Sequence, residues 1–321
     1  MKTLLLSLVA LLITNATIKS QSCEELLLAV QCSTYEQVEG LLKNVNPNCH
    51  HDGTIQPRSP LGMAVSTGDL KTVKLLFKHG AKANYRFKND ASALMIASQK
   101  GHYKIAKYLT ENGAKINIKI DGDGTPLMSA VKGGDPAIVS LLLELEADPN
   151  AEVSGDGNAI MLAGKYGNIE ILKLLLEHSG DIDKKTLGDG TALISAAANG
   201  DITMVQALIA LGAKVDVSSE RDGNPLIMAS KNGHFEVVKY LVDAGADVNV
   251  YVSGDETPLI GAAWNGHLDV VKYLINEGAD INKTVRDSYS ISSEKRNALR
   301  MAKRGKHDQV ITYLISKGAT D

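Results

Sequence analysis

One short motif recurs along this chain at a constant interval of 33 residues. Segments such as SPLGMAVSTG, TPLMSAVKGG and TPLIGAAWNG align without gaps, and seven of them have Leu or Ile as the third residue: Leu61, Leu94, Leu127, Ile160, Leu193, Leu226 and Leu259. The glycine that closes each segment keeps the same interval, from Gly68 to Gly266. A fixed period of this length indicates a repeat architecture, in which neighbouring repeats bury their apolar faces against one another.

Two less regular copies extend the array. ELLLAVQCSTYEQVEGLLKN aligns with the first regular repeat at an offset of 35, and NALRMAKRGKHDQVITYLISKGA follows a seven-residue insertion and has Lys306 at the glycine position. We therefore count nine repeats: a degenerate N-terminal capping repeat at 23–52, seven regular repeats at 53–283, and an insertion with a C-terminal capping repeat at 284–321. Terminal repeats are expected to be atypical because each has one face without a neighbour.

Each repeat has the pattern of two short helices. In the first helix, small residues such as Ala262 and Ala263 allow close helix contact, and Gly266 ends that helix. In LDVVKYLINEG, which follows, the apolar residues have the spacing of one helical face. Gly278 suits the left-handed conformation that ends many helices.

The segment DGDGTPLMSAVKGG, Asp121 to Gly134, raises the alternatives of a phosphate loop, a calcium loop or a turn. A phosphate loop needs G-x-x-x-x-G-K followed by Ser or Thr, which this segment lacks. A calcium-binding EF-hand loop that started at Asp121 would need Glu where Lys132 stands. Asp-Gly favours a turn at a hairpin tip, and Asp123 recurs at the same interval. We predict a turn; a cation attracted by the row of aspartates stays an alternative.

The most regular copy, TPLIGAAWNGHLDVVKYLINEGADIN, resembles the ankyrin repeat, whose pattern is T-P-L-x-x-A-A-x-x-G-H…V-V-x-x-L-L-x-x-G-A-D-x-N. The resemblance covers about residues 24–320. It implies an all-α repeat solenoid of stacked helix-turn-helix repeats with β-hairpin or turn fingers, and a non-enzymatic protein-binding scaffold. The usual His after T-P-L is replaced by Met128, Met161, Ile194, Ile227 or Ile260, which predicts a more apolar support for the turn.

The N-terminal segment MKTLLLSLVALLITNATIKSQS has the pattern of a secretory signal. Its apolar run, Leu4 to Ile13, is too short to span a bilayer as a helix and is followed by small and polar residues. We therefore predict a cleaved signal peptide at 1–22 and a secreted or periplasmic protein, with no membrane insertion of the mature chain. An uncleaved anchor is the alternative. Secreted bacterial ankyrin proteins look similar.

All three cysteines lie in the first repeat. Antiparallel helices bring the start of the first helix close to the end of the second, which makes Cys23 and Cys49 the favoured pair for a disulfide. Cys32 lies near the opposite end. In an oxidising compartment such a bridge would persist; three reduced thiols are the alternative.

Histidines and other reactive side chains mostly follow the repeat. His102, His234, His267 and His307 hold the Gly-His position, where we expect them to cap helices and form hydrogen bonds. CHHD, Cys49 to Asp52, offers metal ligands, but adjacent residues rarely converge on one ion. We predict no catalysis, no cofactor and no metal. The alternative is an enzyme or a metal-dependent accessory protein with a site in the atypical segments 50–60 or 283–296.

The ankyrin resemblance also implies a binding surface. In such stacks the hairpin tips and the first helices line a concave face, from which the two residues before the Gly-His position point. This predicts a partner-binding surface made of Lys100, Lys132, Lys165, Tyr166, Lys231, Trp264 and Arg304, with Arg86, Lys88, Lys119, Lys185 and Tyr251 at the tips.

The chemistry of that surface suggests its partner. Basic residues on a protein of net charge -3 suggest an unidentified protein with an acidic surface, and an exposed Trp264 would be an anchor. The alternative is that the lysines only solvate helix faces. The overall charge gives no sign of nucleic-acid binding, and we expect a monomer.

Overall fold

Paired helices, repeated along the chain, make up the protein. The computed structural model describes residues 23–32, 34–51, 59–87, 90–186, 190–219, 223–252, 256–286 and 295–321. The predicted signal peptide, residues 1–22, lies outside them, as do Lys88 and much of the segments 50–60 and 283–296. The chain divides into two compact units, Met1–Asp148 (unit 1) and Pro149–Asp321 (unit 2).

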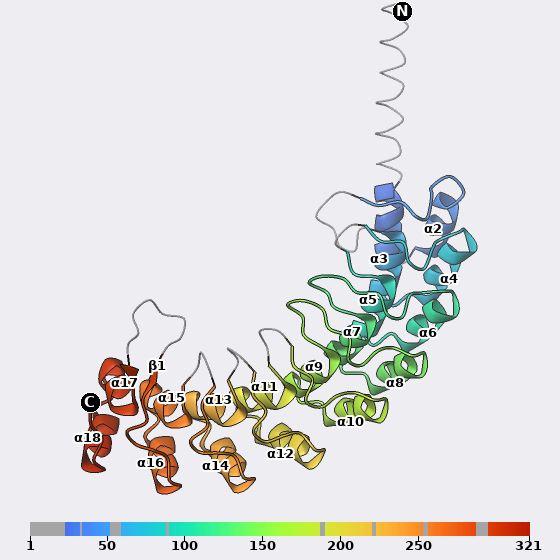
Figure 1. Cartoon of the computed structure of the whole chain (residues 1–321). Coiled ribbons are helices and arrows are strands. Elements are labelled where there is room, and N and C mark those ends of the chain that lie inside the picture. The colour runs from blue at the N-terminus through green and yellow to red at the C-terminus, as the bar shows by residue number, and fades with distance from the viewer. Residues whose placement is uncertain are drawn as a thin grey trace, which may run out of the picture. The chain divides into compact units, whose positions relative to one another are not determined.

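Within the described residues, nine helix pairs follow one another, as the repeat count predicts (Figure 1). The first helices are residues 23–31, α3 (Pro60–Ser66), α5 (Ala93–Gln99), α7 (Pro126–Gly133), α9 (Ala159–Lys165), α11 (Ala192–Asn199), α13 (Pro225–Lys231), α15 (Pro258–Asn265) and α17 (Ala298–Gly305). The second helices are α2 (Tyr35–Leu41), α4 (Leu70–Lys78), α6 (Tyr103–Glu111), α8 (Pro136–Glu144), α10 (Ile169–Glu177), α12 (Ile202–Ala210), α14 (Phe235–Asp243), α16 (Leu268–Asn276) and α18 (Asp308–Ser316).

The start of each first helix is set by a capping side chain. Thr125 Oγ1 accepts a hydrogen bond from the Met128 backbone N–H, and Thr257 Oγ1 accepts one from Ile260. Pro126 and Pro258 follow, at the helix position where a missing N–H costs nothing. The Ser, Thr or Asn at this position in the other repeats from α3 onward caps in the same way.

Small residues let the first helices approach closely within each unit. Ala262 and Ala263 are fully buried, as predicted. A Cβ atom added to Gly133 would lie 2.5 Å from the carbonyl oxygen of Gln99, and one added to Gly164 would lie 3.0 Å from Ala192 Cβ. Side chains at these positions would therefore separate the stacked helices. The second helices bury Val270, Val271, Leu274 and their equivalents against the first helices.

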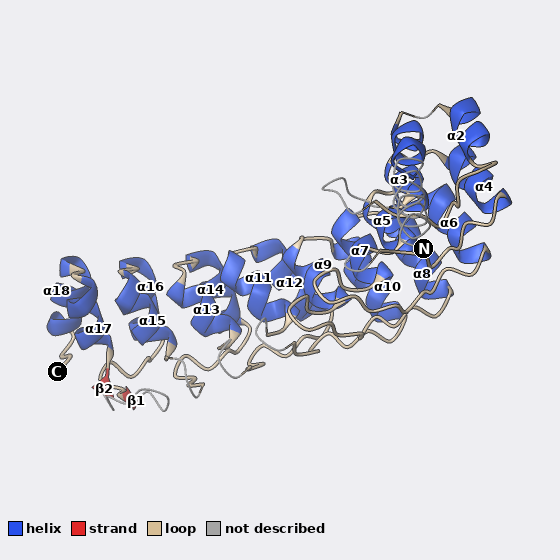
Figure 2. Ribbon diagram, turned by 90° about the horizontal axis from the view of Figure 1, so that it is seen from above, coloured by secondary structure: helices blue, strands red, loops and turns tan. Residues whose placement is uncertain are grey.

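The Asp-Gly segments at 121–124 and 156–157 form turns, as predicted, whereas the equivalent Asp189, Asp222 and Asp255 lie outside the described residues. Isolated β-bridges close them in both units, at Ile120–Gly124 in unit 1 and at Val153–Gly157 in unit 2. Gly122 and Gly124 have positive φ, the conformation that glycine adopts without strain. Met128 is fully buried beneath its turn and approaches Gly124, which fits the apolar support that replaces the usual His. In Figure 2 the loops between repeats lie along one side of the helices of each unit.

The insertion before the last repeat contains a feature that the sequence did not predict. Strands β1 (Val285–Arg286) and β2 (Lys295–Arg296) form an antiparallel pair. Arg296 donates to Glu256 over 2.9 Å, and both side chains are largely buried. This ion pair holds the base of the insertion to the segment that precedes α15. In the last repeat, Lys306 adopts a left-handed conformation with φ 59°, as the glycine that it replaces would.

Three histidines of the Gly-His position act across repeats. No side-chain bond caps the helices that follow His102, His234, His267 and His307, so the predicted capping role is wrong. Instead, the Nε2 atoms of His234, His267 and His307 donate to backbone carbonyls of the preceding repeat, at Ala198 (2.9 Å), Lys231 (3.1 Å) and Trp264 (2.8 Å). Each of these hydrogen bonds forms only when the repeats are stacked, because the acceptor carbonyl belongs to the first helix of the preceding repeat.

A second series of contacts between repeats involves the last Asn of the ankyrin pattern. Its Nδ2 donates to a backbone carbonyl after the next second helix, and its Oδ1 accepts from the backbone two residues further on. The asparagines are Asn48, Asn84, Asn117, Asn150, Asn249 and Asn282. These asparagines were not predicted to have a role, although their near-constant spacing is visible in the sequence.

Candidate functional site

The predicted binding residues of unit 2 lie at the C-terminal ends of its first helices. Lys165 ends α9 and Tyr166 follows it; both are exposed, and the Tyr166 side chain is 54% exposed. Lys231 ends α13 and Arg304 lies in the last turn of α17, and both are exposed. Because first helices pack in register along the unit, their C-terminal ends form one continuous surface.

Trp264 differs from its prediction. It lies in the last turn of α15 and is half-buried rather than exposed. The Arg304 guanidinium lies over the Trp264 ring, 5.6 Å from the ring centre, in a cation–π contact. The arginine reaches back from α17 to cover part of the indole, so the two residues form one composite patch.

Unit 1 carries the remaining predicted residues. Lys100, the C-cap of α5, is exposed, whereas Lys132 in the last turn of α7 is half-buried. At the turns, Lys119 is exposed. Arg86 is half-buried, and its guanidinium donates to the Asp90 carbonyl over 3.4 Å, so this arginine is partly engaged within its own loop.

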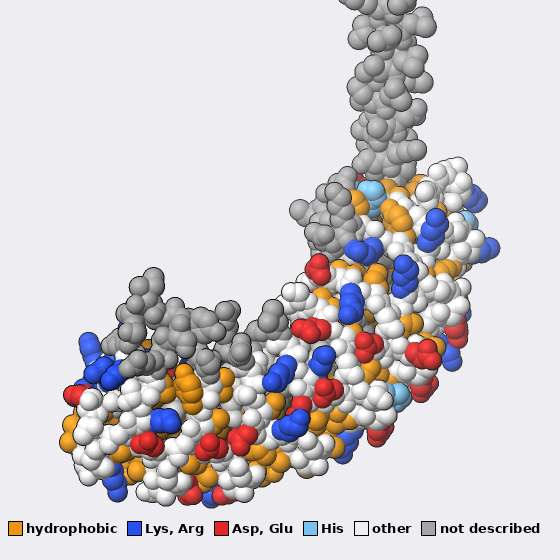
Figure 3. All heavy atoms as spheres, in the orientation of Figure 1, with side chains coloured by type: hydrophobic (Ala, Val, Ile, Leu, Met, Phe, Trp, Pro, Cys, Tyr) orange, Lys and Arg blue, Asp and Glu red, His pale blue; other side chains and the backbone are white. Residues whose placement is uncertain are grey.

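The turns of unit 2 add two residues. Tyr251 precedes α15 and is 41% exposed, and Lys185 precedes α11 and is exposed. Tyr166 and Tyr251 are therefore aromatic side chains that unit 2 presents to solvent, one at a first-helix end and one at a turn. On the face drawn in Figure 3, Lys and Arg side chains alternate with Asp and Glu, so that face is not uniformly basic.

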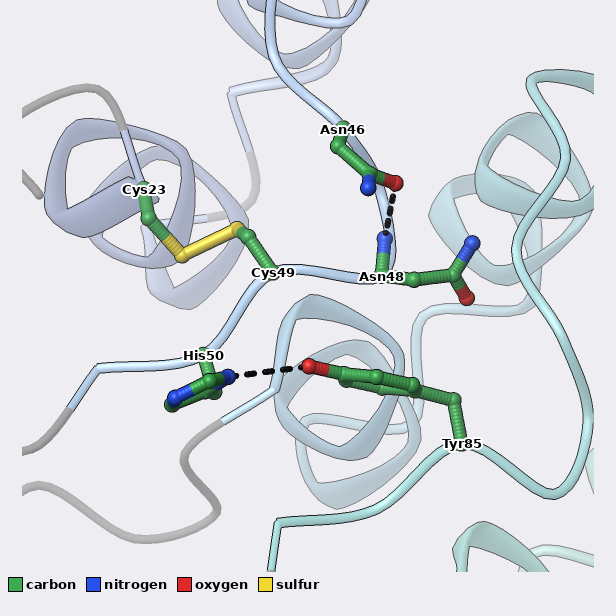
Figure 4. Close-up of a disulfide and its surroundings, with 6 residues drawn as sticks. All are labelled: Cys23, Asn46, Asn48, Cys49, His50 and Tyr85. Carbon is green, nitrogen blue, oxygen red and sulfur yellow. Dashed lines mark hydrogen bonds between the residues drawn. A yellow bond between two sulfur atoms is a disulfide. The ribbon is translucent and has the colours of Figure 1, made fainter. Parts of the chain in front are cut away.

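The first repeat contains the disulfide pair that helix geometry favoured. Cys23 and Cys49 are joined, with their Cα atoms 6.0 Å apart, and Cys32 is a free, exposed thiol (Figure 4). Beside the bridge, His50 Nδ1 and the Tyr85 hydroxyl are hydrogen-bonded at 3.0 Å, and the His50 ring stacks on Phe87 at 4.2 Å. Burial raises the pKa of the Tyr85 phenol. The Cys49–His50 part of CHHD thus has structural contacts.

Across the part of the chain that the structure describes, no three His, Cys, Asp or Glu side chains gather in a way that could hold a metal ion. Among those same residues, no helix combines the length and apolarity needed to cross a membrane. The surface at the first-helix ends remains the candidate site.

Comparisons with known proteins agree with this architecture. The family model described as "Ankyrin repeats (3 copies)" matches residues 26–120, 119–186, 160–252, 193–285 and 252–321. No curated protein matches the chain. Among solved structures, the human ASB11 ankyrin repeat domain is 31% identical, with a TM-score of 0.61, over 70% of this chain and 99% of that one.

Proposed function

Because this chain belongs to the ankyrin repeat family, we propose that it is a non-enzymatic scaffold that binds a protein partner through the C-terminal ends of its first helices. Ankyrin repeats typically mediate protein–protein interaction, and the family is generally non-enzymatic. The observation that carries the choice of surface is the row of exposed side chains in unit 2, where Tyr166 and the Trp264–Arg304 patch lie among lysines. Aromatic residues and arginine are the side chains most enriched among strong interface contacts.

The partner on this proposal is a protein with an acidic surface. Lys165, Lys231 and Arg304 are exposed cations on α9, α13 and α17, which are every second first helix of unit 2. Complementary charge would steer the encounter and make association dependent on salt. The fold by itself does not select a target. We therefore propose only the chemistry of the partner: it has an acidic surface, and a hollow in that surface takes the aromatic side chains of this protein.

The scaffold acts outside the cytoplasm on this proposal. Two observations support it: the signal-like pattern at 1–22, and the Cys23–Cys49 disulfide, since disulfides persist mainly in oxidising compartments. N-terminal sequencing of protein recovered from the medium or the periplasm tests it. A product that still carries Leu4 to Ile13 would contradict cleavage.

The test of the binding surface is a titration against a partner captured by the purified protein. Trp264→Ala is expected to weaken binding by about 2 kcal/mol, because the ring is part of the patch with Arg304. Tyr273→Ala, a half-buried aromatic on α16, is the control and should leave affinity unchanged. Thermal melts run in parallel. Unchanged affinity for Trp264→Ala with a large loss of stability would mean that the indole is packing, and the proposed surface would be wrong.

A further inference from the structure

The second helices of the two units differ in charge at one position of the repeat. A lysine recurs at the same position of the second helix in both units, as Lys74, Lys107, Lys173, Lys239 and Lys272. Three residues before it, unit 2 has an acid, at Glu170, Glu236 and Asp269. Unit 1 has Lys71 and Lys104 there instead. Acid and lysine three residues apart on a helix compensate each other, so the compensated pattern of unit 2 is absent from α4 and α6.

The result is a cluster of lysines on two adjacent helices of unit 1. Lys71, Lys74 and Lys78 on α4 and Lys104 and Lys107 on α6 are all exposed. Helix α4 has no acidic residue, and α6 has only Glu111. None of these five lysines forms an ion pair with another described residue. This concentration of positive charge occurs on a protein whose net charge is -3.

Aromatic contacts hold the two helices together beneath the lysines. The Phe77 ring of α4 meets the Tyr108 ring of α6 edge-on, with centroids 5.4 Å apart, and Lys74 Nζ lies 5.5 Å from the centre of the Tyr108 ring. The lysine ammonium groups therefore lie on a surface formed by two helices, α4 and α6, that pack against each other. In Figure 3, blue side chains lie along the edge of unit 1 that α2 and α4 form.

A groove of about 500 Å³ lies beside this cluster, between α2 and α4. Its lining includes Lys71, Lys74 and Lys78, with Tyr35 and the buried Leu75. Glu36 also lines it, which leaves an excess of positive charge in the groove. We propose that this groove and the lysines of α4 and α6 form a second binding surface, which takes an acidic segment of a partner polypeptide.

The side chains present favour a polypeptide over other anions. A groove bounded by two helices accommodates a chain segment, and the exposed Tyr35 ring offers apolar contact for its side chains. A membrane surface would call for exposed aliphatic side chains to insert, and on α4 and α6 the large exposed apolar residue is Tyr103. These helices carry lysine and no arginine, so the bidentate fork that suits phosphate is missing there. Charge steering combined with a groove fits an acidic peptide best.

This surface is separate from the first-helix ends proposed above, and either one can be tested without the other. The probe is fluorescently labelled poly-L-glutamate, followed by fluorescence anisotropy at low and at moderate salt. The test variant is Lys71→Glu, Lys74→Glu and Lys107→Glu combined. The matched control is Lys173→Glu, Lys239→Glu and Lys272→Glu combined, which makes the same charge change at exposed positions of unit 2 second helices.

We expect the parent protein to bind poly-L-glutamate and the test variant to lose about tenfold or more in affinity, with the control within about twofold of the parent. Binding of the parent should weaken as salt is raised. Equal losses in the two variants would show that only net charge matters, and retained binding by the test variant would show that these lysines are not the site; either result overturns the proposal.

Further arms of the experiment separate the classes of anion. Heparin, phosphatidylserine vesicles and single-stranded DNA are titrated under the same salt conditions. Tighter binding of any of these than of poly-L-glutamate, lost in the test variant, would overturn the assignment to a polypeptide. Thermal melts check the folding of each variant. If the test variant melts earlier than the parent, the combined Lys→Gln changes at the same positions replace it, and these should still weaken binding of poly-L-glutamate.

Discussion

At the scale of single residues, hydrogen bonds between repeats depend on one Asn at the end of the repeat pattern. In two repeats of unit 2 an Asp takes its place. Asp183 and Asp216 accept from the backbone N–H of Lys214 and Asp247, as an Asn would. An ionised carboxylate has no hydrogen to donate, so the bond that Asn249 makes to the Gly278 carbonyl has no counterpart at these two sites.

Asp216→Asn is therefore expected to stabilise the protein. The new amide can donate to the Gly245 carbonyl, which stands at the place equivalent to Gly278, and the gain should be about 0.5–1 kcal/mol in the free energy of unfolding. Urea unfolding of parent and variant measures it. Asp121→Asn, in an exposed turn position of unit 1, is the control and should change little. A lower midpoint for Asp216→Asn would show that the carboxylate is the better acceptor at this site.

At the scale of elements, the first helix pair is held by a covalent link as well as by packing. Residues 23–31 and α2 form a repeat that packs on one neighbour, since α2 contacts α4. The disulfide closes a loop with a sequence separation of 26 between Cys23 and Cys49. Closing such a loop removes conformational freedom from the unfolded chain and so stabilises the folded state. This stabilisation matters for a terminal repeat, because it has fewer neighbours to bury its apolar residues.

Replacing Cys23 and Cys49 together with Ser should lower the free energy of unfolding of the first repeat by about 3 kcal/mol. The measurement is chemical unfolding of oxidised protein, followed by a probe within the first repeat such as hydrogen exchange. Cys32→Ser removes the free, exposed thiol and should leave the midpoint unchanged. If the double variant unfolds at the parent's midpoint, the bridge does not stabilise this repeat.

At the scale of the whole molecule, stability is the sum of repeats and of the interfaces between neighbours, so the ends of the array matter most. In unit 2 the last repeat packs α17 on α15 and α18 on α16. Its own apolar residues Leu299, Met301 and Leu314 are buried. The Arg296–Glu256 pair adds a polar link between the insertion and the segment before α15. The last repeat therefore covers a face that would otherwise be apolar and exposed.

Deleting residues 284–321 should expose the face of α15 and α16 and lower both solubility and the melting temperature. Sedimentation of the concentrated protein and thermal melts measure the two effects. As a control, residues 287–294 are replaced by a Gly-Ser linker of equal length, which keeps the last repeat. A truncated protein as soluble and as thermally stable as the parent would refute the capping assignment.

Much of the fold could be predicted from the sequence because its signals are local. The 33-residue period, the apolar face of each second helix and the glycines after helices depend on the backbone preferences of a few neighbouring residues. Gly278, for example, has φ 91°, as its place at a helix end predicts. Cys23 and Cys49 could be ranked as a pair because antiparallel helices bring their positions together. The position of the candidate site could also be predicted, because the repeat pattern gives the residues at which each first helix ends.

Contacts between side chains of different repeats could not be predicted from the sequence, because they depend on how the repeats stack. His267 binds a carbonyl of the preceding repeat and does not cap its own helix, and Trp264 is half-buried, with the guanidinium of Arg304 from the next repeat over its ring. The insertion closes on itself through β1 and β2 and is tied to Glu256. Such contacts depend on the rise and rotation between stacked helices and on which rotamer fits the neighbouring repeat. The residues next to these side chains in the sequence determine neither the helix geometry nor the rotamer.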